Sequence, residues 1–272
     1  MATAMLSIPI VDGIAKYLST DFSPLFVSWA RYAVASCIIV PIGLHRFGWA
    51  MFPRTQLGAH FFRTLCLVTA MTLYFLSLAL IPMATATSAF FISPILATCL
   101  AVFFFKERFS IAKLVSLLLG VCGMLIIAKP GGAVEPGIIL AIAAGVAFAV
   151  YLVATRVASQ GSDPVKTLVF QCIVGAALLL PQALFTWKVP SAAFVHLFLA
   201  LGLLSVVSHL MSIAAFRYAQ TSVLAPLVYL ELVGAVIIGY FVFDDVPGVE
   251  VIAGAALIVL GGLIVTYYAK NQ

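Results

Sequence analysis

Charge is what this sequence has least of. Only 8% of its residues are charged, 64% are hydrophobic, and the mean hydropathy is +1.22. A soluble domain of this length must cover itself with a polar surface, and this composition cannot supply one. The shortage of charge therefore excludes an ordinary soluble globular protein and indicates that lipid is the main solvent.

The sequence also lacks the short motifs of common catalytic sites. It has no Walker phosphate-binding loop, no dinucleotide-binding glycine fingerprint, no His-Glu-x-x-His and no Gly-x-Ser-x-Gly. ATP-driven transport would need a separate subunit. We therefore expect no enzyme activity and no cofactor.

Cysteine is too sparse and too scattered for a metal site or a disulfide framework. The five cysteines all lie within apolar stretches and none has metal-ligand spacing: Cys37, Cys66, Cys99, Cys122 and Cys172. We interpret them as small apolar filling residues.

What the sequence has instead is ten apolar stretches, each close to 20 residues long. About 20 apolar residues allow a helix to cross a lipid core of roughly 30 Å. The stretches are continuous rather than alternating, which favours helices over a β-barrel. We predict an all-α integral membrane protein with ten transmembrane helices near 3–18, 25–44, 61–80, 85–105, 111–128, 137–155, 167–185, 194–216, 222–243 and 248–268.

The first stretch is short for a span, and we expect that a few residues of its helix are missing at this start. It has no basic leading region and contains Asp12 and Lys16, which argues against a cleavable signal peptide.

The net charge of +5 is distributed unevenly between the predicted loops. With the amino terminus inside, the inner side carries most of the basic residues: Arg46, Arg54, Arg63, Lys106, Arg108, Lys113, Arg156, Lys166, Arg217 and Lys270. The outer side carries Asp21, Glu135, Asp244, Asp245 and Glu250. This positive-inside bias predicts that both termini are cytoplasmic and argues against nucleic-acid binding.

The two halves of the chain repeat each other. Pro24 and Pro164 are 140 residues apart, as are Pro41 and Pro181, and later pairs such as Glu107 and Asp244 are 137 apart. A deletion of three residues in the second copy accounts for both offsets. Because each copy holds five spans, the second copy is inverted relative to the first. We predict repeats at residues 1–129 and 130–272, an arrangement typical of alternating-access carriers.

Several local runs support a family resemblance over essentially the whole chain: Ser23-Pro24, Trp29-Ala30-Arg31, Phe105-Lys106-Glu107-Arg108 and Ala225-Pro226-Leu227-Val228-Tyr229-Leu230-Glu231. With the repeat, they make the chain resemble the EamA-type branch of the drug/metabolite transporter superfamily. The resemblance implies a bacterial inner-membrane carrier of small metabolites, often amino acids or nucleobase-like compounds. One departure is Asp244-Asp245, where the second copy in the family usually has Gly-Glu.

Glu231 is the main candidate for cargo or proton binding. It is the tenth residue of its predicted span, near the bilayer centre, and the first repeat has Pro94 in its place. An ionisable group there costs about 2.5–3.5 kcal/mol and usually faces a cavity or a partner. The small residues Gly234 and Ala235 on the same face are expected to leave room beside the carboxyl. The alternative is a protonated acid that hydrogen-bonds to a neighbouring helix.

Two prolines predict bends beside this site. Pro226 crowds the carbonyl of Ser222, and Pro94 crowds that of Phe90. The freed carbonyls would contact cargo, or the bends would be plain packing kinks.

Further polar residues are secondary candidates for the cavity wall. Asp12 is either a second acidic site or the local partner of Lys16, four residues later. Arg31 binds a substrate carboxylate, or it pairs with Asp12 or Asp21 to hold the first two helices together.

Polar stripes supply the remaining candidates. His209 forms a stripe with Ser205 and Ser212, and either relays protons, binds a ligand or joins helices by hydrogen bonds. Smaller stripes, more typical of packing contacts, pair Tyr74 with Ser77 and Tyr151 with Thr155.

Together these features predict a secondary transporter of the bacterial inner membrane. It moves a small metabolite such as an amino acid, a nucleobase-like compound or a cation by alternating access, coupled to a proton gradient or to the cargo's own gradient. The alternative is a membrane-embedded enzyme or flippase acting on lipid-linked substrates. The expected partners are the small-molecule substrate and the lipid bilayer, with a homodimer as a possible assembly.

Overall fold

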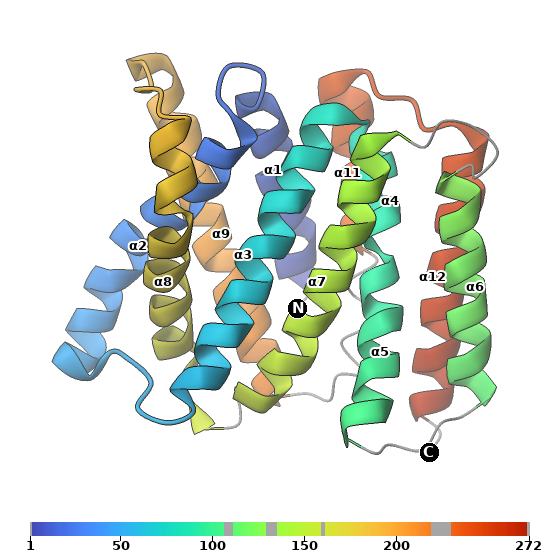
Figure 1. Ribbon diagram of the computed structural model, residues 1–272, viewed down its shortest axis with the longest axis horizontal. Helices are drawn as coiled ribbons and strands as arrows, with labels where there is room; N and C mark the ends of the chain where they lie inside the picture. Colours follow the sequence, from blue (N-terminus) through green and yellow to red (C-terminus); the bar gives the residue numbers. More distant parts are fainter. Residues whose placement is uncertain (1, 106–110, 129–134, 159–160, 219–229, 271–272) are drawn as a thin grey trace.

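The computed structural model describes residues 2–105, 111–128, 135–158, 161–218 and 230–270, and within these ranges it is helical without strands. The helices are α1 (Ala2–Leu18), α2 (Pro24–Phe47), the short 3₁₀ helix η1 (Gly48–Ala50), α3 (Leu57–Leu80), α4 (Met83–Phe90), α5 (Ile92–Phe105), α6 (Ile111–Ala128), α7 (Pro136–Ala158), α8 (Pro164–Phe185), α9 (Ala192–Tyr218), α11 (Leu230–Phe243) and α12 (Val249–Lys270). Figure 1 shows the long helices side by side in one bundle.

The helices confirm an integral membrane protein. Among the described residues five stretches are long and apolar enough to span a bilayer: Pro24–Ala50, Leu57–Leu80, Pro136–Thr155, Pro164–Phe185 and Ala192–Ala215. Shorter apolar helices cover Met83–Ala97, Leu118–Ile127, Glu231–Phe243 and Val249–Ile264. The count of ten spans and the inverted repeat stay predictions. The proposed joint at 129–132 lies outside the described residues, as do Lys106, Glu107 and Arg108 of the run that closes the fourth predicted span.

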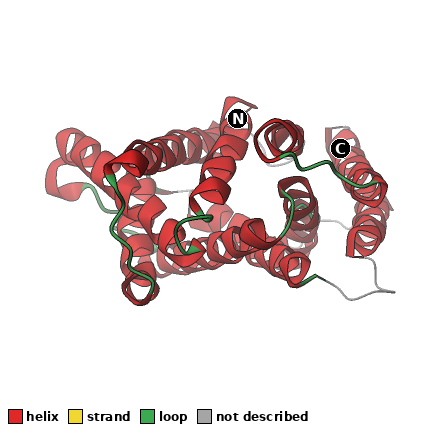
Figure 2. Cartoon of the chain, turned by 90° about the horizontal axis from the view of Figure 1, so that it is seen from above, coloured by secondary structure: helices red, strands yellow, loops and turns green. Residues whose placement is uncertain are grey.

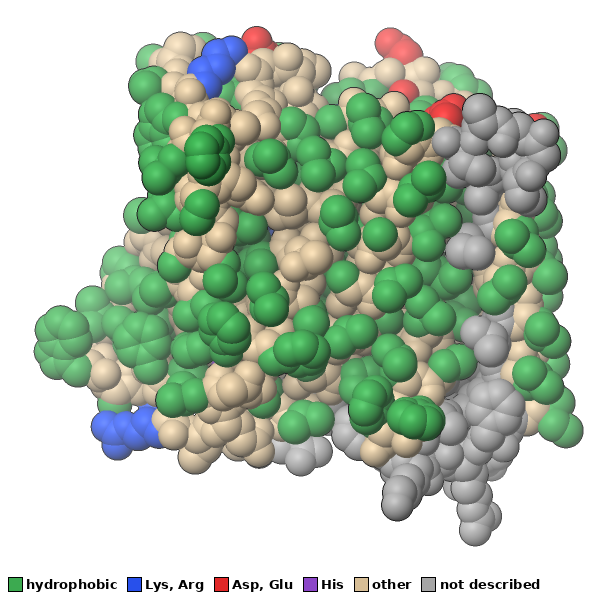
Figure 3. All heavy atoms as spheres, viewed as in Figure 1, with side chains coloured by type: hydrophobic (Ala, Val, Ile, Leu, Met, Phe, Trp, Pro, Cys, Tyr) green, Lys and Arg blue, Asp and Glu red, His purple; other side chains and the backbone are tan. Residues whose placement is uncertain are grey.

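The outer surface agrees with a lipid environment. Figure 3 shows hydrophobic side chains over the middle of the visible face, with charged side chains at its upper and lower edges. Large apolar side chains such as Phe185 and Phe241 are 91% and 78% exposed. Such exposure has little cost when the surroundings are acyl chains rather than water.

Two helices, α2 and α8, begin in the same way. The side chain of Ser23 accepts a hydrogen bond from the backbone N–H of Leu25 at 3.3 Å, and Pro24 starts α2. Asp163 accepts from Val165 N–H at 2.9 Å, and Pro164 starts α8. A capping side chain followed by proline is a strong helix start, since proline lacks only an N–H that the first turn does not use.

The fourth apolar stretch is two helices rather than one. α4 ends at Phe90 and α5 begins at Ile92, while Phe91 between them has φ −73° and ψ 6°. Pro94 lies four residues after Phe90, where its ring meets the Phe90 carbonyl and its missing N–H removes a helical bond. The interruption therefore falls at the residue predicted from Pro94.

The helices form two layers. In Figures 1 and 2, α3, α7, α5 and α6 lie in one layer, and α9, α1, α11 and α12 lie behind it. α2 packs on α8, and α6 packs on α12. The contacts α1–α9, α1–α11 and α2–α9 have counterparts in α3–α7, α5–α7 and α3–α8. The helices correspond as α1 with α7, α2 with α8, α3 with α9 and α5 with α11. Exchanging the members of these pairs turns each of the three contacts into one of its counterparts.

α6 and α12 approach so closely that only glycine fits at the crossing. A Cβ on Gly123 would lie 2.5 Å from the carbonyl oxygen of Gly254, and a Cβ on Gly254 would lie 2.6 Å from that of Gly123. No side chain can yield there, because the neighbouring atom in each case is backbone.

We predict that Gly123→Ala lowers the melting temperature of the purified protein. The added methyl group forces the two backbones apart, at a cost of about 1–3 kcal/mol. Gly58→Ala is the control, because a Cβ there meets no atom within 4 Å. Equal melting of Gly123→Ala and wild type in detergent, measured by fluorescence-detected size exclusion, would contradict this packing.

Candidate functional site

Two buried carboxyl groups from the two halves of the chain lie near each other. Asp12 of α1 and Glu231 of α11 are only 6% and 9% exposed and are close enough to interact electrostatically. The hydroxyl of Tyr74 on α3 hydrogen-bonds to Thr87 Oγ1 of α4 at 2.8 Å, and Tyr74 is close enough to Asp12 to interact with it. We call Asp12, Tyr74 and Glu231 the acidic cluster.

The acidic cluster is closely packed. A Cβ on Gly234 of α11 would lie 2.6 Å from Pro9 Cγ of α1, and a Cβ on Gly13 of α1 would lie 2.9 Å from Ile238 Cγ2 of α11. The expectation that Gly234 leaves room beside Glu231 is therefore wrong, because Pro9 occupies that space. Ala235 is 1% exposed and also lies in packed surroundings.

An ion pair lies at the C-terminal ends of α1 and α11, the ends of these helices that are at the upper side of Figure 1. Lys16 Nζ of α1 is 2.8 Å from Asp245 Oδ2 and donates to the carbonyl oxygen of Ile81 at 3.1 Å. The backbone N–H of Met83 donates to the same Asp245 oxygen at 3.1 Å. Lys16 therefore pairs with a residue of the second half of the chain rather than with Asp12.

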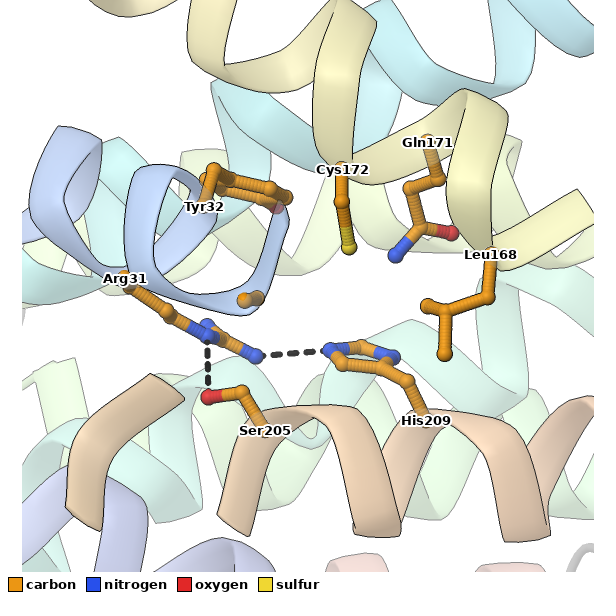
Figure 4. Close-up of a pocket in the computed structure, with 8 residues that line it drawn as sticks. Arg31, Tyr32, Leu168, Gln171, Cys172, Ser205 and His209 are labelled. Atoms are coloured by element: carbon orange, nitrogen blue, oxygen red, sulfur yellow. Dashed lines mark hydrogen bonds between the residues drawn. The ribbon is translucent and has the colours of Figure 1, made fainter. Parts of the chain in front are cut away.

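Arg31 occupies the interface of α2 with α9. Its Nε donates to Ser205 Oγ at 2.9 Å, and its Nη2 lies 2.7 Å from His209 Nε2 (Figure 4). A guanidinium only donates hydrogen bonds, so His209 Nε2 accepts and the neutral ring carries its proton on Nδ1. Arg31 is close enough to Asp12 to interact electrostatically, but among the described residues it forms no ion pair with Asp12 or Asp21, and its direct partners are on α9.

Arg63 is a buried charged residue that the sequence did not predict as a candidate site residue. It was counted with the basic residues of the inner side, at the start of the predicted span 61–80, but α3 begins at Leu57, and Arg63 is fully buried within it. Its Nε donates to Thr155 Oγ1 at 2.8 Å, and its Nη2 donates to Gln171 Oε1 at 2.7 Å and to Tyr151 Oη at 3.1 Å. The Tyr151–Thr155 stripe, a pattern more typical of packing, is the one signal that pointed to a polar partner here.

The polar groups follow one another along α3. Tyr74 is eleven residues after Arg63, about 16 Å along the helix axis. Ser77 donates to the carbonyl oxygen of Gly137 at 2.7 Å, and Ile81 accepts from Lys16 beyond it. The buried charges are thus separated into a basic region near Arg63, the acidic cluster, and the ion pair at the upper end.

A small cavity opens between α2, α8 and α9. It is lined by Arg31, Tyr32, Ala35, Leu168, Gln171, Cys172, Ser205 and His209, and it has room for about one water molecule (Figure 4). A metabolite can enter only if these helices separate.

The structure thus divides the predicted site residues into groups. Asp12, Tyr74 and Glu231 come together, Arg31 meets His209, and Tyr151 belongs with Arg63. Pro94 lies just after the interruption of the fourth apolar stretch, and Pro226 lies outside the described residues. No group of three potential metal ligands occurs in the part of the chain described here.

An all-helical bundle with an apolar exterior and buried charges is the architecture of a multi-pass membrane transport protein. The model of the EamA-like transporter family matches residues 1–129 and 135–267, and the chain belongs to this family. It is therefore a transporter of the drug/metabolite transporter superfamily and not an enzyme.

Curated relatives span nearly the whole chain. The S-adenosylmethionine uptake transporter of Rickettsia conorii is 28% identical over 96% of this chain and 88% of its own length. That of Rickettsia prowazekii is 27% identical over 99% and 92%. The riboflavin transporter of Vibrio cholerae is 28% identical over 100% and 93%. A solved crystal structure shares the fold, with a TM-score of 0.71 at 19% identity over 99% of this chain and 97% of its own.

We predict that Thr155→Val destabilises the protein. The substitution keeps the shape but leaves the Arg63 Nε buried without its acceptor, and a hydrogen bond to a charged group contributes about 1.5–3 kcal/mol. Thr69→Val on the exposed side of α3 is the matched control. Thermal unfolding in detergent should separate the two variants; if Thr155→Val melts no lower than Thr69→Val, the Arg63 network does not stabilise the fold.

Proposed function

We propose that this protein is a secondary carrier that moves a small metabolite bearing a cationic group through the bacterial inner membrane by alternating access. The transport is powered by a proton gradient or by the gradient of the cargo itself. The observation that carries this proposal is the acidic cluster, in which α1 of the first half and α11 of the second each contribute one carboxyl group.

Two adjacent carboxyl groups away from water favour the uptake of positive charge. Ionising both would place two negative charges together in a medium that screens them weakly. A bound proton or a cationic group relieves this repulsion. A proton and a cationic cargo that use the same site compete with each other, and such competition is the simplest way to couple their movements.

The relatives narrow the candidates for the cargo. S-adenosylmethionine, which the Rickettsia relatives are named for, has a sulfonium centre and an amino group, whereas riboflavin has no positive charge at neutral pH. The acidic cluster suits the first chemistry better. We therefore propose a cation of this class as the cargo and use both compounds as test substrates.

The arrangement of the halves supports alternating access. Corresponding contacts relate the two sets of helices, and Lys16–Asp245 joins the halves at the upper end. Acidic side chains gather at that upper edge in Figure 3. By the positive-inside bias we propose that this end faces outward and that both termini are cytoplasmic.

We predict that Glu231→Gln reduces uptake into proteoliposomes by about tenfold or more, because a charge-assisted contact of about 1.5–3 kcal/mol is lost. Uptake is measured with labelled S-adenosylmethionine and labelled riboflavin at equal amounts of reconstituted protein. Glu135→Gln is the control, since Glu135 is exposed before α7. Unchanged uptake by Glu231→Gln of whichever compound the wild type transports would refute the role of the acidic cluster.

We predict that Lys16→Ala opens the upper end. A cysteine in place of Met83, which is 0% exposed beside Asp245, should then react faster with a membrane-impermeant maleimide. The increase should be on the order of fivefold, because a partly exposed ion pair contributes about 1 kcal/mol.

Lys188→Ala is the control for this test, because Lys188 is an exposed lysine that donates to the carbonyl oxygen of Asp21 at 2.6 Å. The charge reversal Lys16→Asp with Asp245→Lys should restore slow labelling. Labelling at the wild-type rate in Lys16→Ala would show that the pair does not close this end.

A further inference from the structure

The cavity between α2, α8 and α9 holds buried hydrogen-bond donors that have no partner. Nη1 of Arg31 and Nε2 of Gln171 are both buried and unpartnered, as is the hydroxyl of Tyr32. The three side chains are 4%, 1% and 2% exposed, and all of them line the cavity. A buried donor without an acceptor costs about 1–3 kcal/mol, and more when it is charged.

The orientation of Gln171 is fixed from behind. Its Oε1 accepts from Arg63 Nη2 at 2.7 Å, so its amide nitrogen turns to the opposite side. Figure 4 shows this nitrogen pointing into the cavity, toward the space between Cys172 and His209. Arg63 thus acts as a positioning residue that holds the Gln171 amide with its N–H groups directed into the cavity.

The cavity is also positively charged. Among the described residues no carboxylate lies within 4.0 Å of Arg31 or Arg63, since the ion pairs found there are Lys16–Asp245 and Arg46–Asp163. His209 accepts the hydrogen bond from Arg31 through Nε2 and is therefore neutral, so it does not balance the charge of Arg31. Two buried guanidinium groups, Arg31 in the cavity wall and Arg63 bonded to the Oε1 of Gln171 behind it, therefore lack a bound carboxylate among the described residues.

We propose that this cavity is an anion subsite of the carrier and that it receives the carboxylate of the transported metabolite, with Arg31, Gln171 and Tyr32 as donors. A carboxylate accepts several hydrogen bonds at once and matches the fork of a guanidinium. Arg31 interacts electrostatically with Asp12, so the subsite adjoins the acidic cluster. The inference rests on the proposed function and extends it: the cargo is a zwitterion whose carboxylate meets Arg31 and whose cationic group meets the acidic cluster.

Cys172 provides a test that needs no knowledge of the cargo, because its thiol lines the cavity. Cys37, Cys66, Cys99 and Cys122 are replaced by alanine, and the remaining thiol is labelled in membranes. The probes are the anionic 2-sulfonatoethyl and the cationic 2-(trimethylammonium)ethyl methanethiosulfonates. Each rate is divided by the rate of the same reagent with free 2-mercaptoethanol.

The normalised rate of the anionic probe should exceed that of the cationic probe by about tenfold or more, since a charged cleft concentrates ions of the opposite sign. Arg31→Gln should abolish the preference and Arg31→Lys should retain it. Arg46→Gln, at the exposed end of the same helix, should leave it unchanged. Acetate should slow labelling more than chloride does at equal ionic strength.

A preference for the cationic probe, or no labelling by either probe, would overturn the proposal without any need for the Arg31 variants. Equal protection by chloride and acetate would also overturn it and would assign the cavity to an inorganic anion. Normal uptake by Glu231→Gln together with an anion preference at Cys172 would refute the acidic cluster alone. Impaired uptake by Glu231→Gln without an anion preference at Cys172 would refute the anion subsite alone.

Discussion

Each charged side chain within this bundle must find its partners on another helix, because the surrounding lipid offers none. Arg63 shows the consequence most clearly: it is fully buried on α3 and is held by Thr155 and Tyr151 of α7 and by Gln171 of α8. An apolar residue there would pack without tying these helices in one orientation. The need to satisfy buried charge therefore determines which helices must lie together.

The same constraint divides the interior by sign. The carboxyl groups come from α1 and α11, and the guanidinium groups come from α2 and α3. α1 has a central position, because it contributes Asp12 to the acidic cluster, Lys16 to the ion pair with Asp245, and Gly13 to the close contact with Ile238. A movement of α1 relative to α11 would change all three contacts at once, which is the behaviour expected of a carrier whose site opens at alternate ends.

Apolar length and proline position predicted the helices well, because both act locally. The interruption of the fourth apolar stretch follows from Pro94 alone, and the matching helix starts follow from Ser23-Pro24 and Asp163-Pro164. The same local signals counted Arg63 with the basic residues of the inner side, because it lay at the start of the predicted span 61–80, whereas α3 begins at Leu57.

The partners of the buried charges were not predictable in this way. Helical spacing predicted Asp12 as a partner of Lys16, but Lys16 bonds to Asp245, which is 229 residues away. Acidic residues were predicted as partners of Arg31, but its hydrogen bonds join it to Ser205 and His209 on α9. These choices depend on how distant helices pack, and spacing within one helix carries no information about that packing. Asp12, Tyr74 and Glu231 were likewise predicted as separate candidates, and the sequence did not indicate that they lie together.

Alternating access requires that the acidic cluster is reached from each side of the membrane in turn. It is tested most directly by a single cysteine at Ala235, one turn from Glu231 and 1% exposed, in a chain otherwise free of cysteine. A membrane-impermeant maleimide should label it from either face of oriented vesicles, whereas a cysteine at the exposed Val246, beyond the end of α11, should react from one face only. Labelling of position 235 from a single face, or from neither, would contradict the account.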